Sequence, residues 1–215
     1  VPPVIHPSII YQNAQKLEDF FQDQCVALFA GDDTSSVAER IKQKAKGLSI
    51  DPLRYFSEEG DSSFVTRALL HSIHRNLHKQ QETVEFDNRK FHLEHIAPQT
   101  PTEEWVQSLT GGGESAAQVY ESYTRKAGNL ILLDKGLNIG AQQKPFQKKC
   151  AEHYKSATFF GLTSDLIAME KWTLEEIDAR TAWLAEMFDI IWSPEKTASQ
   201  VIHFSEWLTK NRAPS

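Results

Sequence analysis

The chain has 215 residues, of which 40% are hydrophobic and 24% charged, and its formal net charge is −6. This composition is ordinary for a soluble globular protein, and no stretch approaches the roughly 18 apolar residues of a membrane-spanning helix. Residues 1–4 lack the charged and apolar regions of a signal peptide. We therefore expect a cytoplasmic protein without membrane contact, and the missing initiator methionine suggests a fragment or a processed chain.

The cysteines and the distribution of charged residues limit the kinds of functional site that the chain can form. The cysteines Cys25 and Cys150 lie far apart in the sequence, which argues against a disulfide framework or a cysteine-based zinc site. Residues 125–155 carry seven basic and two acidic side chains, whereas the remainder of the chain taken together is acidic. Such a basic segment can contact phosphates locally, or it can simply be a solvated helix face.

The N-terminal part is predicted to be helical. Apolar residues at helical spacing predict a helix over residues 8–30, and a second, more polar helix follows over 34–46. Residues 48–61 are expected to form a loop because proline and glycine interrupt them. A stronger amphipathic pattern predicts the next helix over residues 62–79.

Two short strands are predicted in the middle of the chain. They cover residues 91–96 and 130–133, which are apolar runs bounded by turn residues. Between them we expect helices over 102–109 and 114–125, separated by the glycines at 111–113.

The last third of the chain is predicted to be helical again. Residues 138–156 are expected to begin as a loop and to continue into a helix. Thr173 and Glu176 form a capping box at the start of a helix that Pro194 ends, and a final helix is predicted over 197–208.

Together these elements predict an α+β, mostly α-helical fold, in which a strand–strand–helix unit is embedded between N- and C-terminal helices. We expect a helical N-terminal part at 1–85, a core with a helical insertion at 86–157, and a helical C-terminal part at 158–215. The three parts are expected to pack as one domain.

Polar residues at the ends of the two strands suggest a chemistry. His95 follows Glu94 at the end of the first strand, Asn129 opens the second, and Asn138 begins the following helix. A carboxylate, a neutral imidazole and amides beside a basic segment are the groups that metal-assisted phosphodiester hydrolysis requires. Taken singly, they have plainer interpretations as a surface histidine, a turn residue and a helix cap.

In combination, these residues resemble a known class of nuclease. The acidic-His-x-x-Pro element at 94–98, the Gly-Asn-Leu turn at 128–130 and Asn138 resemble the ββα-metal finger of His-Me nucleases, the HNH superfamily. A closer resemblance, over roughly residues 62–193, is to the C-terminal nuclease domain of GmrSD-type restriction proteins, which has relatives in other phage-defence proteins. The other residues that carry it are Gln99, Trp105, Ile131, Leu132, Leu133, Leu137, Phe146, Lys149, Tyr154, Ser156, Trp172, Ile177 and Arg180.

The resemblance implies a role for each matching residue at the strand ends. His95 would be the general base that takes a proton from the attacking water, and Asn129 would hold the finger together and orient this histidine. Glu94 and Asn138 would be the metal ligands, and their oxygen atoms suit Mg²⁺ or Mn²⁺. His95, Asn129 and Asn138 are thus the predicted catalytic set. The family's simplest pattern has aspartate where this chain has Glu94 and histidine where it has Asn138, so the metal geometry is expected to differ.

The resemblance also implies partners. DNA would be the substrate, and Lys144, Lys148 and Lys149 would contact its phosphates. An N-terminal NTPase or sensor domain or subunit outside this chain would supply control, because the sequence has no nucleotide-binding loop. The implied function is a metal-dependent DNA endonuclease domain of an anti-phage restriction protein, which nicks or cleaves its substrate. The alternative is a non-catalytic module that binds nucleic acid or docks a partner, which the acidic net charge favours.

Overall fold

The structure is a computed structural model. The chain consists of two compact units, Val1–Ile50 and Asp51–Ser215. None of the helices in its described residues is long and apolar enough to cross a membrane. The described residues are 19–20, 22–46, 51–58, 64–77, 89–192 and 200–212.

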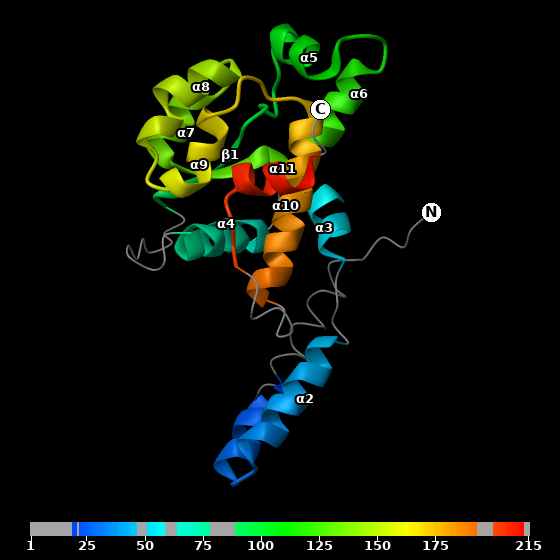
Figure 1. Cartoon of the computed structure of the whole chain (residues 1–215), viewed down its shortest axis with the longest axis vertical. Coiled ribbons are helices and arrows are strands. Elements are labelled where there is room, and N and C mark those ends of the chain that lie inside the picture. Colours follow the sequence, from blue (N-terminus) through cyan, green and yellow to red (C-terminus); the bar gives the residue numbers. More distant parts are fainter. Residues whose placement is uncertain are drawn as a thin grey trace. The chain divides into compact units, whose positions relative to one another are not determined.

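Two helical segments form the described part of the first unit (Figure 1). Residues 22–29 are helical, and α2 spans Thr34–Lys46 as predicted. The Arg40 guanidinium donates a hydrogen bond of 2.7 Å to Gln24 Oε1 and so links the two segments. The predicted helix over 8–30 lies outside the described residues up to residue 18.

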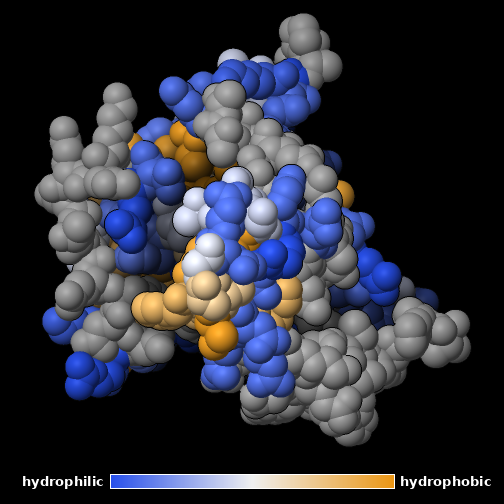
Figure 2. Space-filling view, turned by 90° about the horizontal axis from the view of Figure 1, so that it is seen from below, coloured by the Kyte–Doolittle hydropathy of each residue, from blue (hydrophilic) through white to orange (hydrophobic). Residues whose placement is uncertain are grey.

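Some apolar side chains remain exposed in each unit. Val26 and Phe29 are exposed in the first unit, and Ile139 and Phe160 in the second. Figure 2 shows a hydrophobic patch bordered by hydrophilic residues on the face that it displays. Scattered exposed apolar residues are common on soluble proteins.

The predicted loop over 48–61 is wrong in its centre, because α3 spans Pro52–Glu58. Asp51 Oδ1 accepts a hydrogen bond of 3.2 Å from the Arg54 amide, as an N-cap residue does. Proline is favoured in the first turn of a helix, where no intrahelical donor is needed. Phe56 of α3 is fully buried and lies edge-to-face against Phe188.

A two-stranded antiparallel sheet lies at the centre of the second unit. β1 spans Phe91–His95 and β2 spans Leu130–Asp134, with His95 opposite Leu130. Both strands were predicted, and their pairing was not. The helix α4, Phe64–Leu77, agrees with the prediction within the described residues and contacts β2.

Two helices and a short 3-10 turn connect the strands. α5 spans Glu103–Thr110 and α6 spans Ala116–Thr124, as the sequence predicted. The three glycines between them all have positive φ angles of 74° to 102°, which explains why glycine stands there. The 3-10 turn η2, Ala127–Asn129, leads directly into β2.

Helices follow β2 without a long loop. α7 spans Lys135–Ala141, α8 spans Phe146–Glu152, the 3-10 turn η3 spans Tyr154–Ser156, and α9 spans Phe160–Ile167. Figure 1 shows α7, α8 and α9 grouped together, with α5 and α6 extending elsewhere. Asn138 was expected to open a loop that leads into a helix. It lies instead inside α7, because the helix begins directly after β2.

The C-terminal helices are α10, Leu174–Trp192, and α11, Phe204–Asn211. Half of the predicted capping box is present, since Glu176 Oε2 accepts a hydrogen bond of 3.1 Å from the Thr173 amide. The Thr173 hydroxyl also donates to this carboxylate. The predicted start of the final helix is wrong, because residues 200–203 are not helical.

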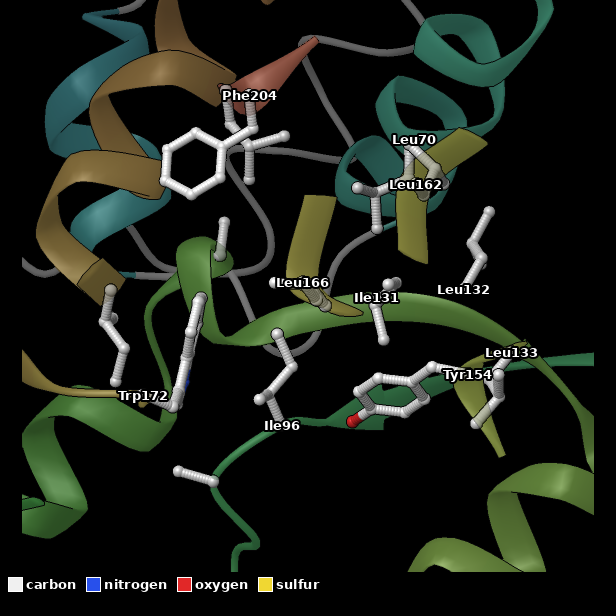
Figure 3. Packing of buried hydrophobic residues seen from close by; sticks show 14 of the residues in the cluster. Leu70, Ile96, Ile131, Leu132, Leu133, Tyr154, Leu162, Leu166, Trp172 and Phe204 are labelled. Atoms are coloured by element: carbon white, nitrogen blue, oxygen red, sulfur yellow. The ribbon is translucent and has the colours of Figure 1, made fainter. Parts of the chain in front are cut away.

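The core surrounds β2, whose residues Leu130–Leu133 are completely buried. Figure 3 shows Ile131 and Leu133 beside Tyr154, while Leu132 lies toward Leu162 and Leu70. Apolar side chains on both faces explain why this strand is a continuous apolar run rather than an alternating one.

Candidate active site

Asn129 is the most completely bonded residue at the start of β2, and it is fully buried. Its Oδ1 accepts hydrogen bonds from the Ala97 amide at 2.8 Å and from Trp172 Nε1 at 3.2 Å. Its Nδ2 donates to the carbonyl oxygens of Ala97 at 2.9 Å and Thr124 at 3.2 Å. These four bonds use the full capacity of a side-chain amide, so Asn129 has none left for a substrate.

The bonds of Asn129 fix the backbone that leaves β1. In addition to the Ala97 contacts, the Asn129 carbonyl accepts a hydrogen bond of 2.9 Å from the Ile96 amide. The segment directly after His95 is thereby tied to the turn before β2, and His95 is half-buried at this junction.

Helix α10 holds the same turn from its other side. Arg180 Nη1 donates to the carbonyl oxygens of Gly128 at 2.7 Å and Leu130 at 2.6 Å. The Gly128 amide donates to Thr181 Oγ1 at 3.2 Å. A Cβ on Gly128 would overlap the Ile177 carbonyl oxygen and lie 2.7 Å from the Thr181 nitrogen, so only glycine permits this approach.

Glu94 and Lys149 form a buried ion pair beneath the end of β1. Lys149 Nζ lies 2.6 Å from Glu94 Oε1, and the two side chains are 0% and 6% exposed. The same ammonium donates a hydrogen bond of 2.8 Å to the His95 carbonyl oxygen. Burial raises the pKa of the Glu94 carboxyl, and the positive charge of Lys149 opposes that rise.

A fully buried phenol lies close to this pair. Burial, followed by the negative charge of Glu94, raises the pKa of Tyr154 well above its usual value. Among the described residues, no hydrogen-bond partner is found for the Tyr154 hydroxyl. Burial also raises the pKa of the neighbouring Cys150 thiol to about 12, so this cysteine is unreactive while it stays buried.

Asn138 projects from α7 toward β1. Its Nδ2 donates a hydrogen bond of 3.2 Å to the Leu93 carbonyl oxygen, which leaves the amide oxygen as its remaining ligand atom. This bond ties α7 to the residue before Glu94. The side chains of Glu94 and His95 themselves point to opposite faces of the strand.

The three lysines proposed to contact phosphates have different surroundings. Lys148 is exposed. Lys144 Nζ lies 2.7 Å from Glu152 Oε2 and 2.8 Å from His153 Nε2, and it is partly exposed. Lys149 has no exposed side-chain surface, so its position suits a structural ion pair and not a contact with DNA at the surface.

Glu94 and Asn138 carry oxygen atoms of the kind that Mg²⁺ prefers, and Glu94 Oε1 is already bonded to Lys149 Nζ in a site with almost no solvent access. No group of three or more His, Cys, Asp and Glu side chains gathers within the described part of the chain. Mg²⁺, however, is usually bound by one or two carboxylates together with waters and substrate phosphates.

Comparison with known proteins gives one result. A family model described as "GmrSD restriction endonucleases, C-terminal domain" matches residues 53–187. This stretch contains α3 except for its first residue, all of α4 to α9, most of α10 and every candidate residue discussed above. No curated protein and no solved structure matches the chain.

Proposed function

Because the chain belongs to the family of GmrSD restriction endonuclease C-terminal domains, and is thus a nuclease domain of the restriction type, we propose that it is a metal-dependent DNA endonuclease domain with a ββα-metal finger of the HNH type. The observation that carries the proposal is the junction of β1, β2 and α7, where Asn129 fixes the backbone after His95 and Asn138 is bonded to β1. These contacts support the proposal because they hold the backbone on both sides of Glu94 and His95.

In this proposal His95 is the general base. A neutral imidazole has an unprotonated ring nitrogen, which can accept a proton from the attacking water. Asn129 is a positioning residue, because its buried amide orients the His95 segment without a spare hydrogen-bonding group.

Glu94 and Asn138 would hold Mg²⁺ or Mn²⁺. When bound, such an ion polarises the scissile phosphate and stabilises the leaving oxygen. Lys148, and Lys144 once released from Glu152, would contact flanking phosphates and position the strand. We propose DNA as the substrate of an anti-phage restriction protein, and a separate NTPase or sensor domain or subunit as the regulator.

The test is cleavage of supercoiled plasmid DNA by wild type and His95→Ala, with Mg²⁺, with Mn²⁺ and with EDTA. His92→Ala is the matched control, because it removes an imidazole from the same strand. We expect His95→Ala to lose roughly 10²–10⁴-fold in rate, His92→Ala to stay within about threefold, and EDTA to abolish cleavage. The product form, relaxed or linear, distinguishes nicking from double-strand cleavage.

Equal rates for folded His95→Ala and wild type would remove His95 as the base. Cleavage that persists in EDTA would remove the metal. Retained DNA binding without cleavage under any metal would instead favour a binding module.

A further inference from the structure

The Glu94 carboxylate, which is proposed to bind a metal ion, already pairs with a lysine of the same chain. Lys149 Nζ lies 2.6 Å from Glu94 Oε1 in an environment with almost no solvent access. We propose that Lys149 is the built-in counter-ion of the metal site: it balances Glu94 in the metal-free domain and competes with the divalent ion for this carboxylate. The inference rests on the proposed function, because it takes Glu94 as a metal ligand.

Several contacts fix the position of the Lys149 ammonium. It also donates to the His95 carbonyl oxygen at 2.8 Å, and it lies 5.9 Å from the centroid of the Trp105 ring. Trp105 is itself buried and anchored, since its Nε1 donates to the carbonyl oxygens of Gln143 at 3.1 Å and Lys144 at 3.2 Å. The ammonium therefore cannot swing into solvent without moving the chain around it.

Burial explains why such a counter-ion is needed. An isolated carboxylate loses its hydration on burial, and an opposite charge with good geometry compensates part of that loss. Removal of Lys149 alone should therefore destabilise the metal-free domain strongly. Removal of both charges should destabilise it much less.

The positive charge of Lys149 should lower the affinity of the site for a divalent cation. A divalent cation beside Glu94 must either share the carboxylate with Lys149 or displace the ammonium from Oε1. In a buried site two cations repel each other strongly, so both routes weaken metal binding. Replacing Lys149 with an apolar side chain of similar length should strengthen it.

The test uses Mn²⁺ alone as the probe and the full 215-residue chain. Mn²⁺ affinity is measured by calorimetry, and thermal unfolding is followed with and without Mn²⁺, for wild type, Lys149→Met, Glu94→Gln and the exposed control Lys148→Met. We expect Lys149→Met to bind Mn²⁺ at least about tenfold more tightly, which corresponds to ~1.4 kcal/mol. It should also show a larger Mn²⁺-induced rise in unfolding temperature than wild type. Lys148→Met should match wild type, and Glu94→Gln should lose binding.

The outcomes separate the two proposals. If wild type binds Mn²⁺ through Glu94 and Lys149→Met binds it equally or more weakly, only the counter-ion role is overturned. If neither binds Mn²⁺, the metal site and the counter-ion role are both overturned. Should Lys149→Met fail to fold without metal, Lys149→Gln replaces it in the titration, because glutamine can still donate to the His95 carbonyl.

Discussion

At the scale of single residues, Asn129 and Gly128 in the turn before β2 make structural contacts only. Asn129 uses all four of its hydrogen bonds on the protein itself. Gly128 beside it has no side chain, and this is what lets α10 approach. Both residues act by holding the backbone on either side of the junction at His95.

Gly128→Ala tests this close approach. The new methyl group would overlap the Ile177 carbonyl oxygen, which is backbone and cannot rotate away. We expect a loss of about 2–4 kcal/mol in the free energy of unfolding, as for other overpacked positions with backbone shifts. Urea unfolding followed by circular dichroism measures it.

Gly136→Ala is the matched control for Gly128→Ala. Gly136 lies in α7, and nothing stands within 4 Å of a Cβ added there. Alanine should be neutral or stabilising by up to about 1 kcal/mol, because it favours the helix. A comparable loss at both positions would show that the approach of α10 is not the cause.

At the scale of elements, caps come from distant parts of the chain. Asp165 of α9 accepts a hydrogen bond of 2.9 Å from the Phe204 amide and one of 2.7 Å from the Ser205 hydroxyl. The first of these bonds satisfies a backbone N–H that has no partner within α11, and the second holds the same turn through a side chain. They explain why α11 begins at Phe204 and not near residue 197.

Asp165→Ala should loosen the start of α11. We expect a loss of about 1–2 kcal/mol, seen as faster amide hydrogen exchange at residues 204–208. Lys210→Ala, which removes an exposed ion pair with Glu206 from the last turn of the helix, is the control and should leave this exchange nearly unchanged. Equal protection in both variants would mean that Asp165 does not cap the helix.

At the scale of the whole molecule, the buried thiol of Cys150 can be used to detect opening of the second unit. Cys150 is buried, whereas Cys25 of the first unit is exposed. The thiolate is the reactive form of cysteine, and burial raises the pKa of Cys150 to about 12.

Labelling with a thiol reagent should therefore occur in two phases. Cys25 should react fast, and Cys150 only when the second unit opens. Cys25→Ser should remove the fast phase and leave the slow one. Fast labelling of both thiols in the native protein would contradict the burial of Cys150.

The sequence by itself determined the elements that depend on neighbouring residues. The glycines after α5, the capping box of α10 and the apolar runs of β1 and β2 were predicted from local rules. The candidates His95, Glu94, Asn129 and Asn138 were named from their order along the chain. Their chemical roles remain proposals.

Only the tertiary structure decided the features that depend on contacts between distant residues. Lys149 looked like one of several surface lysines, yet it is buried against Glu94, which lies far away in the sequence. Trp172 bonds to Asn129, and Asp165 sets the start of α11, through contacts of the same long-range kind. The physical reason is that a buried charge or amide needs a partner wherever the fold can bring one, and local sequence patterns do not record which residue that will be.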